Sequence, residues 1–221
     1  MTRPTTPKAS TPATTPAASA EAALGAYRAL LERYHRTLDL LSPAGYADIE
    51  RHLAEAERYA AAVAELAPSG GPIVDLGSGA GLPGVVVAAR LAPREVWWVE
   101  RRRRRATFLT QVAASSGLAS VRVFEKDVRR LARPATGIAA VTAQAVGTLS
   151  EVAALTLPLW GSRVLLVSRK GPDWPAEVDA LTAWLRGVGR TADGSWADPR
   201  VLRSEALGTR GTLVAVEVLG G

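Results

Sequence analysis

Residues 75–84 read DLGSGAGLPG and place four glycines directly after a short apolar run, with Asp75 at the front. Where a strand turns into a helix, glycines permit a tight turn and let a ligand approach the backbone. The first N–H groups of the helix lack intrahelical partners and can bind an anionic ligand. Pro83 suits the first helical turn because it has no donor to lose. The stretch is typical of a nucleotide-cofactor loop; the alternative is a purely structural turn.

The acids around this loop indicate which cofactor it binds. Three of the glycines also satisfy the dinucleotide fingerprint, but that spacing alone is a weak signal. The carboxylate of Asp75 would repel a pyrophosphate and attract a ligand that carries an ammonium and a sulfonium, such as S-adenosylmethionine. Glu100 ends the next expected strand, where an acid accepts both ribose hydroxyls. Asp127 follows the third strand, either in reach of the adenine amino group or as a surface acid.

Short apolar runs alternate with helical patterns around these residues. We expect strands at residues 73–76, 95–100, 121–124, 138–143 and 162–168, and helices at 83–91, 102–116, 148–157 and 175–188. This alternation predicts an α/β fold with a parallel sheet that is covered on both faces. The closing strands, 201–204 and 212–218, leave no room for a helix between them and predict an antiparallel hairpin at one edge.

The segments before the loop have a different character. Apolar residues at helical spacing predict two helices, at 21–41 and 47–66, with the break at Ser42-Pro43 and Gly45. Residues 1–20 are almost entirely Thr, Pro, Ala and Ser, which cannot offset the entropy of ordering, so they predict a disordered tail. A chain of 221 residues allows one main domain. We therefore expect a tail (1–20), a helical cap (21–68) and a catalytic domain (69–221).

Composition narrows the class of protein. The chain has no cysteine and only two histidines, which excludes disulfides and thiolate zinc sites, and we expect no metal. No apolar run approaches the roughly 20 residues of a membrane helix, so we expect a cytoplasmic protein, and we expect a monomer. A net charge of +6 fits a polyanionic partner such as RNA. The alternative origin of this charge is an arginine-rich genome.

Four segments carry a resemblance to a known family: VDLGSGAGLPG (74–84), VERRRRRATFLTQV (99–112), VTAQAVGTL (141–149) and LLVSRKG (165–171). They resemble the bacterial small-subunit ribosomal RNA methyltransferase G family, also called glucose-inhibited division protein B. The resemblance extends over about residues 24–218. It implies a class I, Rossmann-like S-adenosylmethionine-dependent methyltransferase fold behind an N-terminal helical cap. It also implies methyl transfer to guanine N7 of 16S ribosomal RNA, in the small ribosomal subunit.

Site residues follow from the loop and from this resemblance. We expect the cofactor to contact Asp75, Gly77, Ser78, Gly79, Gly81, Leu82, Pro83, Glu100, Asp127, Val128 and Gln144. We expect RNA to contact Arg51, His52, Arg101, Arg102, Arg103, Arg104 and Lys170. The candidates for contact with the reacting groups are Gln144, Lys170 and His52. Cations at a helix N-terminus are locally unfavourable, which favours an RNA role for the arginine run over a solvated face.

Several positions depart from the family pattern and indicate a divergent member. The cap helix of the family carries Arg-His followed by Asp-Ser, where this chain has Glu55 and Ala56. The usual Thr-Ala-Arg after the fourth strand ends here in Gln144, which removes a cation, and the acid customary after the third strand falls on Arg129. Alternatives therefore stay open: a methyltransferase for another RNA or a small molecule, a nicotinamide-dependent dehydrogenase, which Asp75 disfavours, or a non-catalytic cofactor- or RNA-binding protein.

Overall fold

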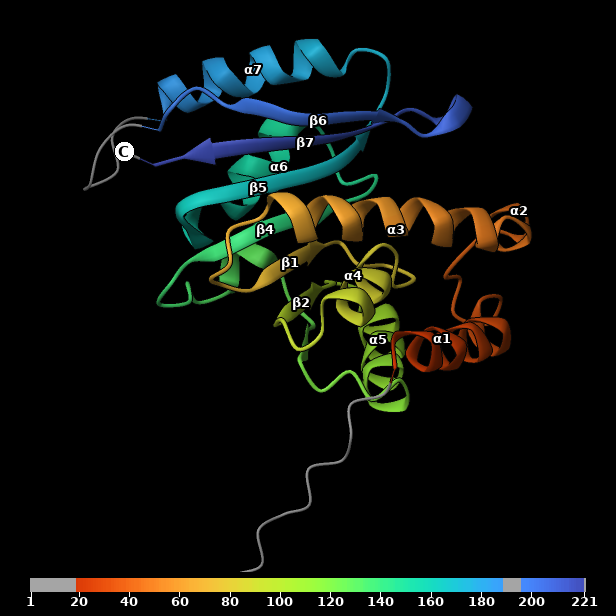
Figure 1. The fold of residues 1–221 in the computed structure, drawn as a ribbon. Coiled ribbons are helices and arrows are strands. Elements are labelled where there is room, and N and C mark those ends of the chain that lie inside the picture. The colour runs from red at the N-terminus through yellow and green to blue at the C-terminus, as the bar shows by residue number, and fades with distance from the viewer. Residues whose placement is uncertain (1–18, 189–195, 221) are drawn as a thin grey trace, which may run out of the picture.

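The centre of the protein is a seven-stranded sheet (Figure 1), seen in a computed structural model that describes residues 19–188 and 196–220. The strands run in the order β3-β2-β1-β4-β5-β7-β6. Their bounds are β1 Ile73–Leu76, β2 Val96–Val99, β3 Val121–Phe124, β4 Ile138–Ala143, β5 Trp160–Lys170, β6 Arg200–Ala206 and β7 Thr212–Leu219. The first five strands are parallel, and β7 lies antiparallel between β5 and β6. The expected parallel sheet with an antiparallel edge hairpin is confirmed.

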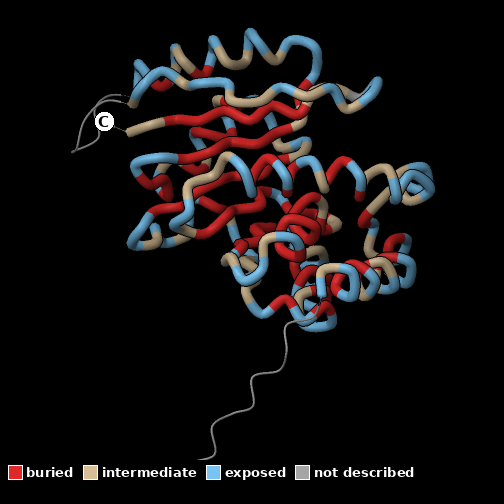
Figure 2. Tube along the Cα trace, viewed as in Figure 1, coloured by how far each residue is buried: buried red, intermediate tan, exposed pale blue. Residues whose placement is uncertain are grey.

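Helices cover both faces of this sheet. They are α1 Ala20–Tyr34, α2 Pro43–Ala47, α3 Ile49–Leu66, α4 Gly84–Leu91, α5 Arg103–Ser115, α6 Leu149–Thr156 and α7 Trp174–Gly187, with short 3-10 turns η1 Val128–Arg130, η2 Leu157–Leu159 and η3 Gly208–Arg210. Residues of α1, α3, α4 and α5 pack on one face, and residues of α6 and α7 on the other. The buried strands between these layers form the red centre of Figure 2. This three-layer arrangement is that of class I methyltransferases.

The period of two along each strand divides the core between the two faces. Trp98 packs with the residues of α4 and α5, whereas its neighbour Trp97 packs with the residues of α6. Both side chains are buried, as expected from their place in a strand. A strand that is covered on both faces must be apolar throughout, which explains why VWWV shows no alternation of polar and apolar residues.

The N-terminal helices share the core of the sheet. Leu24 and Tyr27 of α1 and Tyr59 of α3 belong to the same packed cluster as Val85 of α4 and Trp98 of β2. The segment expected as a cap is thus part of the layer that covers one sheet face, and α3 lies across the front of the sheet in Figure 1. The expected boundary at residues 68–69 falls between the end of α3 and the start of β1.

Two details of the N-terminal half correct the sequence prediction. The first helix ends at Tyr34 and does not continue to Leu41, because the chain turns and Asp39 adopts a φ of +49°. Ser42 and Pro43 do break a helix, but they also start one: the Ser42 hydroxyl accepts the Gly45 N–H and Pro43 opens the short helix α2. The tail predicted for residues 1–20 lies almost entirely outside the described residues. No helix in the described ranges has the length and apolarity of a membrane span.

Candidate active site

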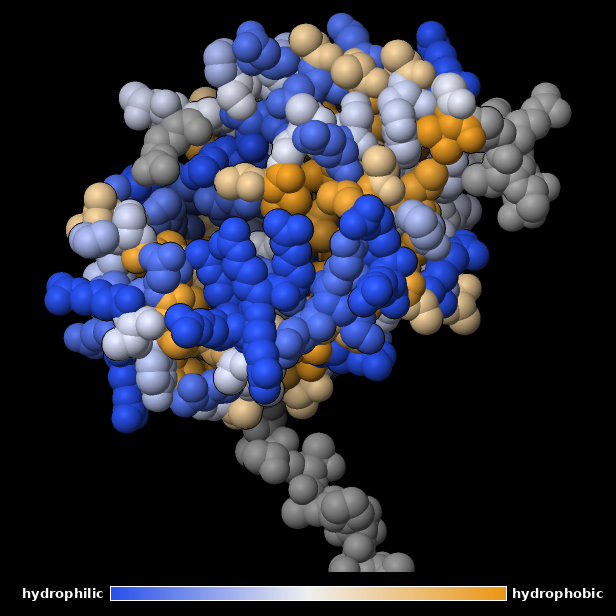
Figure 3. Space-filling view, turned by 180° about the vertical axis from the view of Figure 1, so that it is seen from behind, coloured by the Kyte–Doolittle hydropathy of each residue, from blue (hydrophilic) through white to orange (hydrophobic). Residues whose placement is uncertain are grey.

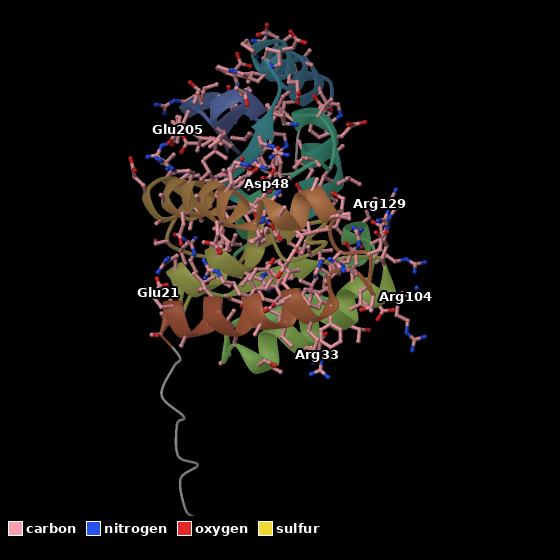
Figure 4. All side chains as sticks on the ribbon, turned by 90° about the vertical axis from the view of Figure 1, so that its right-hand side faces the viewer. Glu21, Arg33, Asp48, Arg104, Arg129 and Glu205 are labelled. Carbon is pink, nitrogen blue, oxygen red and sulfur yellow. The ribbon has the colours of Figure 1, made fainter. Side chains whose placement is uncertain are left out.

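A cavity of about 600 Å³ lies at the carboxyl ends of β1, β2, β3 and β4. Its wall consists of residues 76–80, 99–102, 126–129 and 144–146, together with Leu40, Leu41, His52, Leu82, Arg105 and Leu155. Open α/β sheets bind ligands at this edge, beside the point where the strand order reverses, which here is between β1 and β4. The volume falls in the range of small-molecule sites. Figure 4 looks onto this end of the sheet, with Arg104 and Arg129 on the same side.

The glycine loop forms part of the wall with its backbone. Gly77 and Gly79 have φ angles of +71° and +54°, a region that is strained for residues with a side chain. The N–H groups of Gly77 and Ser78 donate to the Val99 carbonyl at 2.9 and 3.2 Å, which fixes the loop to the end of β2. The loop is therefore rigidly held, and its backbone faces the cavity.

Helix α1 supports the loop from behind. The Tyr27 hydroxyl donates to the Ala80 carbonyl at 3.0 Å, and burial raises the pKa of Tyr27 far above its usual value, so it stays a neutral donor. A Cβ added at Gly81 would lie 2.8 Å from Val85 Cγ2 and 3.2 Å from Tyr27 Cε2. Gly81 is thus required for packing. Contrary to expectation, Gly81 and Pro83 do not line the cavity.

Glu100 has the geometry expected of a ribose-binding acid. Its side chain lines the cavity, and its two carboxylate oxygens are held separately: Oε2 accepts the Gly79 N–H at 3.1 Å and Oε1 accepts the Arg102 N–H at 2.8 Å. Each oxygen has a second lone pair for another donor. Two fixed acceptors at the end of β2 fit the paired ribose hydroxyls of S-adenosylmethionine.

Asp75 lies elsewhere than the sequence indicated. Its side chain is 1% exposed and is absent from the cavity wall, because it points from β1 under the start of α4. Thr142 Oγ1 donates to Asp75 Oδ1 at 2.6 Å, while Oδ2 has no hydrogen-bond partner. A Cβ added at Gly84 would collide with that oxygen. The prediction that the Asp75 carboxylate directly contacts a ligand in the cavity is therefore wrong.

Burial dominates the electrostatics of Asp75. Desolvation raises its pKa from 3.8 to about 6, against the opposing effects of Thr142, Ser78 and the Gly84 amide. The Gly84 amide favours the charged form without reaching the geometry of a full hydrogen bond. Oδ2 lies close to Gly84 at the start of α4, so the Asp75 carboxylate faces this helix and not the cavity.

The loop after β4 and helix α3 complete the wall. Gln144, Ala145 and Val146 directly follow β4, and His52 comes from α3. His52 Nδ1 lies 3.9 Å from Glu55 Oε2, and its side chain is 13% exposed. Gln144 and His52 thus both line the cavity and stay candidates for contact with the substrate.

Cations gather at the mouth of the cavity. Arg101 and Arg102 line it as expected, together with Arg105, Lys126 and Arg129. The five wall cations outnumber the two wall acids, Glu100 and Asp127. On the face opposite that of Figure 1, strongly hydrophilic side chains gather in the lower middle of the molecule, below an apolar area (Figure 3). The cavity therefore has an electropositive rim.

Asp127 and Val128 also take their expected places in the wall. The Asp127 carboxylate accepts Arg129 Nη2 at 2.6 Å, and this contact holds the pKa of Asp127 well below its usual range. Arg129 thus stands beside the acid expected to reach the adenine.

Four of the residues expected to touch RNA lie outside the wall. Arg51 pairs with Glu55 on its own helix and with Asp48 directly before that helix, and Arg103 and Arg104 are exposed on the first turn of α5. The prediction that Lys170 contacts RNA and the reacting groups is wrong, because its side chain is 4% exposed and its Nζ lies 2.9 Å from Glu177 Oε2. An ammonium that is buried and paired within the protein does not contact RNA or the reacting groups.

Sequence reasoning missed half of the wall residues: Leu40, Leu41, Leu76, Ala80, Val99, Arg105, Lys126, Arg129, Ala145, Val146 and Leu155. Arg105 had a detectable signal, because residues three and four apart share one side of a helix and Arg105 stands at that spacing from Arg101 and Arg102. Leu40 and Leu41 had none. They lie in the connection between α1 and α2, whose path depends on how the helices dock.

Comparisons with known proteins agree with this geometry. The profile of rRNA small subunit methyltransferase G matches residues 20–185. A ribosomal RNA small subunit methyltransferase G of Beutenbergia cavernae is 37% identical over 126 residues, which cover 57% of this chain and 59% of that protein. One of Arthrobacter sp. (strain FB24) is 36% identical and is covered over 55% of its length. The chain thus matches less than two thirds of these two proteins.

A longer match comes from Mycobacterium sp. (strain JLS), whose ribosomal RNA small subunit methyltransferase G is 32% identical over 202 residues, covering 86% of this chain and 84% of that protein. Among solved structures, Pyrococcus horikoshii TYW2 in complex with MeSAdo has a TM-score of 0.56 at 15% identity, covering 82% and 65% of the two chains. That likeness shows the methyltransferase fold alone. Because the family profile matches residues 20–185, a range that contains every residue of the cavity wall, the chain belongs to the rRNA small subunit methyltransferase G family.

Proposed function

We propose that this protein transfers a methyl group from S-adenosylmethionine to guanine N7 of 16S ribosomal RNA in the small ribosomal subunit. One observation carries the proposal: a single cavity combines the acceptor pair of Glu100 and the glycine-loop backbone with a rim of arginines. The part of the cavity formed by Glu100 and the glycine loop suits a nucleoside cofactor. The arginine rim suits the phosphates that flank a target nucleotide.

The residues that would hold the cofactor come from three strand ends. Glu100 would accept the ribose hydroxyls, the backbone of residues 77–79 would contact the methionine part, and Val128 and Leu82 would offer apolar surface to the adenine. Asp127 would accept the adenine amino group, since its carboxylate stays ionised beside Arg129. When bound, S-adenosylmethionine supplies a methyl group on a positively charged sulfur.

The reaction needs few groups from the protein. Guanine N7 carries an in-plane lone pair, so its attack on the methyl group requires no general base. The wall residues would act by alignment, an effect that lowers barriers by up to about 10 kcal/mol when the reacting atoms are held in line. Gln144 and His52 line the space that remains for the base. The side-chain donors and acceptors of these two residues would orient the purine without removing a proton.

Gln144 favours a second candidate function. A neutral amide stands where the family pattern places an arginine, so the cavity offers one cation fewer to an RNA substrate. This change would fit a different methyl acceptor, either another RNA or a small molecule. It would also fit a protein that binds its ligands without catalysis.

Methyl transfer to authentic subunits tests the proposal. Small ribosomal subunits that lack this modification would be incubated with the protein and tritiated S-adenosylmethionine, and the RNA digested to nucleosides. We expect label in 7-methylguanosine. Label in another nucleoside would move the function to a different acceptor. Absence of label from the wild-type protein, with activity restored by Gln144→Arg, would show that the substitution weakened the enzyme.

The rim arginines should act on RNA affinity. Replacing Arg101 and Arg102 together with alanine is expected to weaken binding to 16S RNA and to lower the slope of log affinity against log salt by about 2, since each phosphate contact contributes about one unit. The Arg102 N–H that holds Glu100 is retained, so cofactor affinity should not change. Filter binding between about 50 and 200 mM salt measures the slope.

The control for this pair is Arg122→Ala, which removes an exposed arginine at the edge strand β3, outside the cavity wall. Its slope should equal that of the wild type. An equal slope for the double variant would show that the rim does not contact RNA.

A further inference from the structure

The loop between β4 and α6 has a backbone conformation that is unfavourable without support from its surroundings. Gln144, Ala145 and Val146 form one wall of the cavity. Ala145 adopts a φ of +56°, which disfavours any residue with a side chain, and Gly147 follows at +143°. A backbone in this conformation costs on the order of 1–3 kcal/mol and persists where its surroundings impose it.

The strand next to β4 supplies these surroundings. Lys170, the last residue of β5, donates through Nζ to the Gly147 carbonyl at 2.5 Å. The same ammonium lies 2.9 Å from Glu177 Oε2 on α7. Glu177 in turn accepts the Leu149 N–H at 2.9 Å, at the start of α6. One buried cation thus connects the end of the loop with the helix that follows it.

The other end of the loop is also held by β5. Ser168 Oγ donates to the Ala143 carbonyl at 2.9 Å, one residue before Gln144. The side chain of Lys170 is 4% exposed, and the ammonium carries a charge that burial makes costly unless it is bonded. Gly147 and Glu177 satisfy this need, so the lysine and the loop fix each other.

We propose that Lys170 is a positioning residue: its ammonium holds the Gly147 carbonyl and so keeps residues 144–146 in the conformation that forms the cavity wall. The role acts through the loop backbone and requires no contact with substrate. It rests on the proposed function only in that methyl transfer is one of its readouts.

The test is Lys170→Met, which keeps the length of the side chain and removes the ammonium. Hydrogen exchange followed by mass spectrometry should show the amides of residues 144–148 exchanging at least about 10-fold faster, because the loop loses its fixed end. With S-adenosylmethionine and small subunits, kcat should fall about 100-fold, as displacements of about 1 Å remote from the chemistry can cause. Lys170→Arg, which retains a donor, should restore most of both.

Two variants separate positioning from general stability. Arg163→Met removes the cation that pairs with Glu217 at the opposite end of β5, and it should leave loop exchange and kcat unchanged. Should Lys170→Met not fold, the double variant Lys170→Met, Glu177→Gln removes both charges of the pair and carries the same expectation.

Wild-type exchange at residues 144–148, or a kcat within about 3-fold of wild type for a folded Lys170→Met, would overturn the proposal. Hydrogen exchange needs no methyl acceptor. If the wild-type protein transferred no methyl group to subunits, the proposed function would fail, and faster loop exchange in Lys170→Met would still support the positioning role.

Discussion

Replacing Glu100 with glutamine should weaken the binding of S-adenosylmethionine by about 100-fold, because one residue serves four donors. The two carboxylate oxygens accept the N–H groups of Gly79 and Arg102, and we propose that they also accept the two ribose hydroxyls. Glutamine offers one oxygen and an NH2 group, which leaves a backbone N–H facing another donor. Loss of a charge-assisted hydrogen bond costs about 1.5–3 kcal/mol, and one such loss corresponds to roughly 10- to 150-fold in affinity.

Isothermal titration calorimetry with S-adenosylmethionine or S-adenosylhomocysteine measures this change. The matched control is Glu95→Gln, just before the amino end of the same strand, where the carboxylate binds Trp97 Nε1 and lies outside the cavity wall. It should bind the cofactor as the wild type does. Affinity within about 3-fold of wild type for Glu100→Gln would place the ribose elsewhere.

The second large effect is on stability and comes from Asp75. A carboxyl group whose pKa is about 6 in the folded protein and 3.8 in the unfolded chain contributes most to stability below pH 3.8, and this contribution is lost as the pH rises through 6. Relative to low pH, ionisation of this buried carboxyl group therefore destabilises the folded state by about 3 kcal/mol at pH 7.5 and by about 1 kcal/mol at pH 4.5. The amide introduced by Asp75→Asn does not titrate and avoids this loss.

The stability of Asp75→Asn relative to the wild type should therefore be about 2 kcal/mol greater at pH 7.5 than at pH 4.5. Urea unfolding of both proteins at the two pH values gives this difference, and contributions from other acids cancel in it. Thr142 can still donate to the asparagine oxygen, so the fold is retained. A difference that is independent of pH would mean that Asp75 is not held in a desolvated site.

Much of the fold could be predicted from the sequence because its elements are bounded by local signals. The predicted ends of the strands at 121–124 and 138–143 agree with the structure, because a polar residue, Glu125 or Gln144, directly follows each apolar run. The residue at which the first helix ends could not be predicted. Leu38 and Leu41 continue its spacing, but they face a core that only the docked helices α1 and α3 create.

The site residues also divide into those that could be predicted from the sequence and those that could not. Glu100 and Gly79 were predictable because a strand end fixes where they lie. Asp75 was assigned to the cofactor, and Lys170 to RNA and the reacting groups, but both side chains are buried outside the cavity wall. A strand residue one position earlier or later points to the opposite face, and sequence gives no sign of whether a carboxylate faces the ligand or the underside of the next helix.

The placement of β7 has a genetic consequence. This strand runs along the full inner part of β5, from Lys170 opposite Thr212 to Arg163 opposite Leu219. A frameshift or a premature stop codon between Lys170 and Thr212 would spare every cavity residue and still remove the neighbour of β5, leaving an apolar strand with unpaired N–H and C=O groups. Inactivating alleles would therefore map well beyond the residues that touch a ligand, and their products would be recovered as aggregates.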